Sequence, residues 1–233
     1  MRKSWMRDAG DLPKAHECAL SSICSIINRF SGRRFEKTSA SIEGRMSLTA
    51  QFIQGIDICE VSIAEGLYAQ AAALLKQQLE TIAAIDEFEN NRRKEGKTPN
   101  IGKGVTKNFG SIYGDLNGIA HVSRQGFARQ LVAIEKGELC APSLTPKYNA
   151  ELSQLLYGYH VYFIVEVGRQ VERIFMEALD ERFSSREVSL HLFAMAVLMR
   201  EKVIELPPEI KERFSIFDLN KVYKDFLGEV PAR

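Results

Sequence analysis

Apolar residues recur at helical spacing over most of this chain, and that periodicity limits what it can fold into. The clearest cases are Leu67–Asn90 and Tyr148–Phe183, where apolar side chains return every three or four residues. We find no segment in which apolar and polar residues alternate, as they would in a half-buried strand. The sequence therefore predicts an all-α fold, an antiparallel helical bundle of about six to eight helices with no significant sheet.

Shorter runs and capping signals place the other helices. Ser184-Ser185-Arg186-Glu187 matches the S-x-x-E capping box, which predicts a helix start. Residues 31–45 are rich in serine, glycine and charge and predict a loop. The remaining helices are expected at 16–30, 46–64, 109–121, 127–135 and 215–226. We divide the chain into an N-terminal helix and loop (1–45), a central bundle (46–183) and a C-terminal helical extension packed on it (184–233), forming a single domain.

Composition and charge exclude several classes of protein. The chain has 233 residues, of which 45% are hydrophobic, enough for a substantial core. Its 31 Lys and Arg nearly balance its 30 Asp and Glu, so it has no global charge that would attract nucleic acid. No apolar run is long enough to cross a membrane, and no secretory signal is recognisable. The four cysteines form no C-x-x-C pair, which favours reduced thiols and a cytoplasmic protein.

Metal and cofactor motifs are also missing from the sequence. None of the four histidines has a glutamate three residues before it, as the helices of di-iron bundles require. Zinc-type spacing of Cys and His is absent, and Gly102-Lys103-Gly104 belongs to neither a P-loop nor a dinucleotide fingerprint. We therefore expect no metal site and no cofactor.

Three glycines give the predicted helix at 109–121 an unusual ridge. Gly110, Gly114 and Gly118 lie one turn apart, and each should cost roughly 1 kcal/mol relative to alanine in a helix interior. Close approach of another backbone would offset that cost. We therefore expect the ridge to pack against the small residues of the helix at 67–90, namely Ala69, Ala73 and Ala83.

Such packing would bring four polar side chains together. Lys76 and Glu80 lie one turn apart on one helix, and Asn117 and His121 lie one turn apart on the other. A carboxylate beside a histidine suits general acid–base catalysis. A buried Glu–His pair that only fixes helix register is the alternative. His160, on the apolar side of its helix, is expected to be a core histidine.

The most basic segment follows the helix at 67–90. Arg92, Arg93, Lys94, Lys97, Lys103 and Lys107 face only Glu95, a local charge of +5 from six cations and one anion. A solvated loop and a contact with RNA or a nucleotide are both compatible with this 92–107 loop.

At these positions the chain resembles a known family. Lys76-Gln-Gln-Leu-Glu80, a polar loop, Tyr113-Gly-Asp-Leu116 and then His121 resemble the pattern of uncharacterised bacterial helical bundles related to HEPN domains, over residues 46–180. The resemblance implies an all-α bundle, frequent homodimers and, in many members, metal-independent RNA cleavage by an Arg-x(4–6)-His motif. Here no arginine stands five to seven residues before His121, and Arg124 follows it instead.

Three functions follow as hypotheses. The first is a binding or regulatory module, with contacts from Tyr113, Asn117, Arg124, Arg92, Arg93 and Lys103. The second is a ribonuclease-like phosphodiesterase in which His121 is the general acid or base, Glu80 orients it and Lys76 contacts phosphate. The third is a homodimeric scaffold. Whether the protein is an enzyme stays open at this point.

Overall fold

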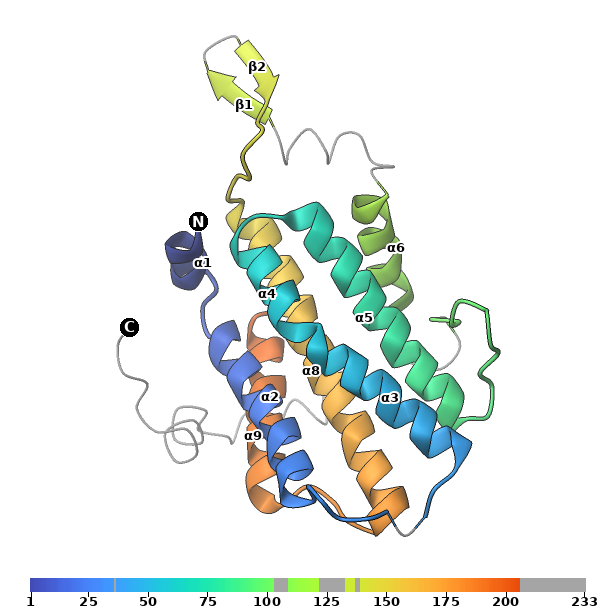
Figure 1. The fold of residues 1–233 in the computed structure, drawn as a ribbon. Coiled ribbons are helices and arrows are strands. Elements are labelled where there is room, and N and C mark those ends of the chain that lie inside the picture. Colours follow the sequence, from blue (N-terminus) through green and yellow to red (C-terminus); the bar gives the residue numbers. More distant parts are fainter. Residues whose placement is uncertain (36, 103–108, 122–132, 137–138, 206–233) are drawn as a thin grey trace. The chain divides into compact units, whose positions relative to one another are not determined.

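The computed structural model describes residues 1–35, 37–102, 109–121, 133–136 and 139–205, and this part of the chain is predominantly helical (Figure 1). It contains eight helices and one short hairpin. The predicted all-α fold is confirmed. The elements are α1 (Arg2–Asp8), α2 (Leu12–Arg29), α3 (Ala40–Gln54), α4 (Ile56–Ala64), α5 (Tyr68–Glu89), α6 (Phe109–Ala120), β1 (Ala133–Lys136), β2 (Leu139–Pro142), α8 (Ala150–Leu179) and α9 (Ser185–Arg200).

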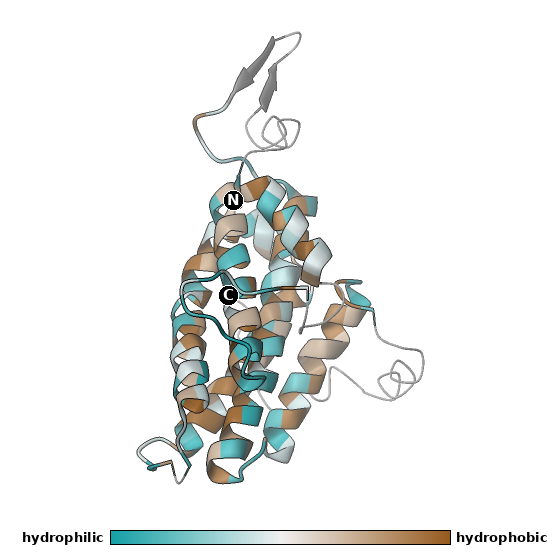
Figure 2. Cartoon of the chain, turned by 90° about the vertical axis from the view of Figure 1, so that its right-hand side faces the viewer, coloured by the Kyte–Doolittle hydropathy of each residue, from teal (hydrophilic) through white to brown (hydrophobic). Residues whose placement is uncertain are grey.

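The helices with the clearest sequence signals form close to where they were predicted. Both α5 and α8 follow the long apolar stripes, and Figure 2 shows hydrophobic and hydrophilic residues interleaved along individual helices, as an amphipathic pattern requires. The capping box of α9 is complete. Ser184 accepts a hydrogen bond from the Glu187 backbone N–H at 3.3 Å, and the Glu187 carboxylate accepts one from the Ser184 N–H at 2.6 Å.

The helix predicted at 46–64 is wrong in its bounds. It is two helices, α3 and α4, separated at Gly55, whose N–H donates to the Phe52 carbonyl at 3.0 Å and so tightens the last turn of α3. The first of them begins at Ala40, inside the predicted loop. Burial explains the early start, because Ile42 packs in an apolar cluster with Ile174 and Ala178 and offsets a weakly helical sequence.

A hairpin replaces the end of the helix predicted at 127–135. Residues 133–136 form β1, which pairs antiparallel with β2 in the register Ala133↔Pro142 to Lys136↔Leu139. A helix of nine residues is marginal in isolation, whereas two paired strands satisfy each other's backbone groups. The rest of that predicted helix, and the one predicted at 215–226, lie outside the described residues.

The chain forms two compact units. The first comprises residues 1–10 and 47–160. Within it, α4 and α6 both pack against α5, and α1 contacts α4. The buried face of α5 is fully inaccessible at Ala71, Leu75 and Ile82. The Trp5 and Tyr157 rings meet edge to face, with centroids 5.0 Å apart.

The second unit comprises residues 11–46 and those from 161 onward. Here α2 and α9 lie side by side along their lengths (Figure 1). Arg29 of α2 donates to the buried Glu187 carboxylate of α9 at 2.8 Å. Arg45, which is 1% exposed, pairs with Glu177 of α8. None of the described helices is long and apolar enough to cross a membrane.

Candidate functional site

Helix α6 carries one side of the predicted site, and its apolar stripe holds it against α5. Phe109 and Leu116 are fully buried, and Ile112 and Ile119 are nearly so. These residues lie three or four positions apart and therefore share one face. Figure 1 shows α6 lying alongside α5. Packing of this face positions the polar residues at the end of α6.

The glycine ridge does not make the predicted contact. A Cβ atom added at Gly110 or Gly114 would meet no atom of the described residues within 4 Å, and Ala73 of α5 is exposed. Only Gly118 is buried. The predicted packing of the ridge on the alanine face is therefore wrong. Large apolar side chains gain more from burial than glycines do, so the stripe of Phe109 and Leu116 faces α5 in place of the ridge.

Gly114 is a position where a larger residue should stabilise the protein. The variant Gly114→Ala is expected to be about 1 kcal/mol more stable than the wild type, because alanine is the better helix former and its methyl group would contact none of the described residues. Chemical denaturation would measure the change. Gly168→Ala in α8 is the matched control, since its methyl group would lie 3.3 Å from His191 and should cancel much of the gain. Equal gains at both positions would contradict this account.

The polar cluster at the end of α6 forms with different partners from those predicted. Lys76 Nζ lies 3.0 Å from His121 Nε2, and the Tyr113 hydroxyl donates to Glu80 Oε1 at 2.8 Å. The Lys76 ammonium also lies 5.4 Å from the centre of the Tyr113 ring. Lys76, Glu80, Tyr113 and His121 therefore meet, but no hydrogen bond joins Glu80 to His121 in the described part of the chain.

These contacts define what the cluster can do. A donating Lys76 requires an unprotonated Nε2, which assigns the Nδ1–H tautomer to His121. Burial, followed by the hydrogen bond and the charge of Glu80, raises the pKa of Tyr113 to about 12, so this phenol stays a donor at neutral pH. Glu80 is thus held by Tyr113, and the exposed His121 is held by Lys76. A carboxylate-oriented general base is not assembled in this arrangement.

Of the other residues predicted for the site, some lie in the described part of the chain and some lie outside it. Asn117 is half-buried on α6, and its carbonyl accepts a hydrogen bond from the His121 N–H at 3.1 Å. Arg124 and Lys103 lie outside the described residues. The described His, Cys, Asp and Glu residues form no group that could hold a metal ion.

The basic loop after α5 encloses a hollow of about 480 Å³ in the first unit. Residues of the last turn of α5 and of the loop line it: Glu87, Asn91, Arg92, Arg93, Lys94, Lys97, Thr98 and Asn100. Four of these are cationic and one is anionic. The volume falls within the range of small-molecule sites, roughly 300–1,000 Å³.

Two carboxylates that the sequence analysis overlooked organise this hollow. Asp86 pairs with Arg92 at 2.5 Å, and Glu87 pairs with Arg93 at 3.3 Å. Glu87 also accepts a hydrogen bond from the Asn100 N–H at 2.8 Å, which closes the loop on the helix. Each acid lies six residues before its arginine, with the end of α5 between them. This spacing is the feature of the sequence that could have predicted the two ion pairs.

The lysines of the hollow differ from its arginines. Arg93 donates to the Lys94 and Lys97 carbonyls at 3.0 and 2.8 Å, which fixes the backbone that carries both lysines. Within the described chain, neither lysine has a carboxylate partner, and both side chains are exposed. Their ammonium groups are therefore available to an anion.

Comparison of the chain with protein-family models, with curated proteins and with solved structures found no match.

Proposed function

We propose that this protein is a HEPN-like, helical binding module that takes a phosphate-bearing ligand, RNA or a nucleotide, in the hollow of residues 87–100. The observation that carries the proposal is the pair Lys94 and Lys97, which face a basic hollow without carboxylate partners in the described residues. As part of the proposal, the protein is a homodimer, as the family resemblance implies, and it is cytoplasmic, as its cysteine usage favours.

Charge supports this assignment. Arg92 and Arg93 are largely neutralised by Asp86 and Glu87, so their part is to shape the loop. The two lysines then supply the net positive charge that draws in phosphate groups. Lysine ammonium groups contact phosphate as point charges and carry no base specificity, so binding should depend on salt more than on sequence.

RNA binding tests the proposal. The double variant Lys94→Ala/Lys97→Ala is expected to bind a short, fluorescently labelled single-stranded RNA at least about tenfold more weakly than the wild type. The slope of log affinity against log salt should fall by about 1.4, since each phosphate contact on a single strand contributes about 0.7. Fluorescence polarisation at several salt concentrations measures both quantities.

The matched control removes two other exposed lysines. Lys3 and Lys37 are exposed and do not line the hollow, so Lys3→Ala/Lys37→Ala should leave the affinity close to that of the wild type. Competition by a nucleoside triphosphate would separate nucleotide binding from RNA binding. Equal losses in the two double variants, or no binding of either ligand by the wild type, would reject the hollow as the site.

A second candidate function rests on the contact between Lys76 and His121. A cationic amine 3.0 Å from an exposed imidazole places a phosphate-binding group beside a proton-transfer group, as RNA cleavage requires. Incubation of RNA with and without a chelator tests it. Cleavage that survives the chelator and disappears in His121→Ala would assign ribonuclease activity and replace the simple binding module. Retention of intact RNA would exclude that activity.

A further inference from the structure

The two lysines of the hollow stand at the two ends of one tight turn. The Lys97 N–H donates to the Lys94 carbonyl at 3.3 Å, and Gly96 has a φ of 69°. A type II turn requires a positive φ at this position, and it brings its first and last Cα atoms to less than about 7 Å apart. Both lysines line the hollow, whereas Glu95, which lies between them, does not. The turn therefore presents two neighbouring positive charges to one space.

Arg93 holds this turn in place. Its guanidinium donates to the carbonyls of Lys94 and Lys97, the first and last residues of the turn, at 3.0 and 2.8 Å. The same group pairs with Glu87 of α5 at 3.3 Å. Because the backbone of both lysines is fixed before a ligand arrives, binding costs less conformational entropy. The fold thus sets the positions from which the two ammonium groups reach a ligand.

The lining of the hollow favours phosphate groups over bases. Proteins that bind single strands without sequence preference stack the bases on aromatic side chains. None of the described residues that line the hollow is aromatic. Arg92 and Arg93 are paired with carboxylates, so the remaining positive charge is that of the two lysines. Affinity must then come from the density of negative charge on the ligand, which is highest where phosphates are joined directly to one another.

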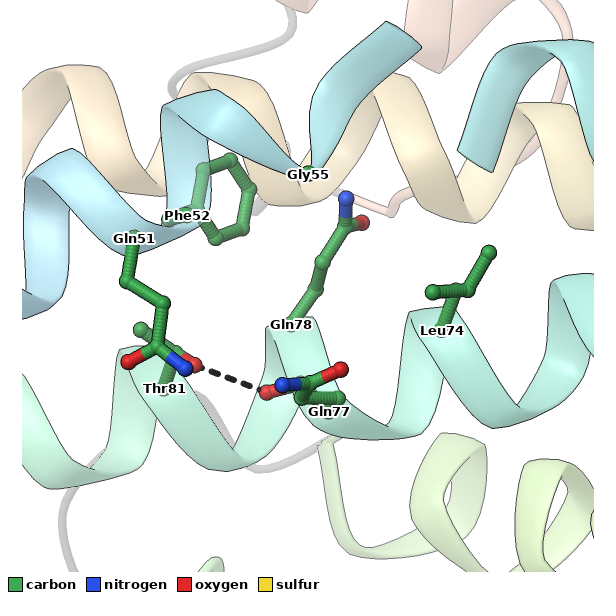
Figure 3. Close-up of a pocket in the computed structure, with 7 residues that line it drawn as sticks. All are labelled: Gln51, Phe52, Gly55, Leu74, Gln77, Gln78 and Thr81. Atoms are coloured by element: carbon green, nitrogen blue, oxygen red, sulfur yellow. Dashed lines mark hydrogen bonds between the residues drawn. The ribbon is translucent and has the colours of Figure 1, made fainter. Parts of the chain in front are cut away.

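A smaller cavity in the same unit offers a contrast. It lies where the junction of α3 and α4 faces α5, and its volume is about 60 Å³ (Figure 3). No charged residue of the described chain lines it, and the Thr81 hydroxyl there already donates to the Gln77 carbonyl at 2.9 Å (Figure 3). An anion would lose its hydration in this cavity and gain no cation. Of the two spaces, only the hollow is suited to phosphate.

We propose that the hollow binds a run of directly joined phosphates, the diphosphate or triphosphate at the end of a nucleotide or of an RNA chain. Lys94 and Lys97 contact neighbouring phosphate groups of this run. The inference rests on the proposed function and narrows its ligand class. A phosphate inside an RNA strand carries a single negative charge, whereas joined phosphates place several within reach of one turn. Each lysine then makes its own charge-assisted hydrogen bond.

Isothermal titration calorimetry on the full chain, in magnesium-free buffer at constant ionic strength, tests the proposal. ADP should bind at least about tenfold more tightly than AMP, because its second phosphate gives the second lysine a partner. Inorganic pyrophosphate should match ADP to within about threefold, since no base is stacked. An RNA with a 5′-triphosphate is compared with the same RNA carrying a 5′-hydroxyl. A preference larger than that for ADP over AMP assigns the RNA end as the source, and a smaller one assigns a free nucleotide.

Gly96→Val separates the geometry of the turn from its charge. Valine is strongly disfavoured at a positive φ, so the turn should open while both lysines remain, and the preference for ADP over AMP should fall below about threefold. Gly32→Val is the matched control, because Gly32 also has a positive φ and does not line the hollow. At both glycines an added Cβ would meet none of the described residues within 4 Å. The control should keep the full preference.

A second variant covers the case in which Gly96→Val does not fold. Lys97→Ala removes one of the two charges at an exposed position and should reduce the preference for ADP in the same way. Equal affinities of the wild type for ADP and AMP, or a full preference in Lys97→Ala, would overturn the inference. The proposed function would still stand if RNA with a 5′-hydroxyl bound through the two lysines. Failure of the wild type to bind any of these ligands would reject the proposed function itself.

Discussion

Phe109→Ala is expected to cost about 3–5 kcal/mol of unfolding free energy, the range for removing a fully buried aromatic side chain. Phe109 is 0% exposed and begins the apolar stripe that holds α6 on α5. The stripe has only four well-buried side chains, and two glycines on the opposite side lower the intrinsic stability of the helix. Loss of its largest member should therefore loosen α6 as well as the whole fold.

Denaturant titration and hydrogen exchange would measure these two effects. Exchange at the amides of α6 should rise more than exchange at α5, because α5 keeps its contacts with α4. Ser111→Ala is the matched control on the same helix, since Ser111 is exposed and its loss should change stability by less than about 0.5 kcal/mol. Similar stabilities for the two variants would mean that α6 is not held by its apolar stripe.

A second large effect is expected at His191 when the pH falls. Burial, with a smaller contribution from the positive charge of Arg169, lowers the pKa of His191 from 6.5 to about 4 in the folded protein. Between these two pKa values, the imidazole binds a proton in the unfolded chain and stays neutral in the folded chain. Above pH 6.5 the imidazole is neutral in both states, and the free energy of unfolding is at its full value. As the pH falls from about 6.5 to 4, the free energy of unfolding decreases by about 3 kcal/mol in total.

Replacement of the imidazole isolates this contribution. Neither ring nitrogen of His191 has a hydrogen-bond partner within the described chain, so His191→Leu removes two unsatisfied polar atoms at similar volume. The stability difference between His191→Leu and the wild type should widen in favour of the variant as the pH falls from 7 to 4. His191→Asn, which is polar but does not titrate, should show the same pH dependence as His191→Leu. Parallel curves for the wild type and both variants would contradict the assignment.

Local sequence signals predicted the helices that carry the fold, and the errors arose where tertiary burial outweighed them. Residues 31–45 read as a loop because serine, glycine and charge dominate them. The end of that segment is helical, because Ile42 and Arg45 are buried, the latter beside Glu177 of α8. Contacts between residues this distant in sequence have no local signature.

The sequence by itself determined the all-α fold, the capping of α9 and the basic character of the loop after α5, because all three depend on residues close together in the chain. Tertiary structure alone decided which face of α6 meets α5, and with it the pairing of His121 with Lys76 and of Glu80 with Tyr113. Both an apolar stripe and a glycine ridge were available on that helix. Burial of the larger side chains releases more free energy, so the stripe packs inward, and Gly110 and Gly114 stay exposed.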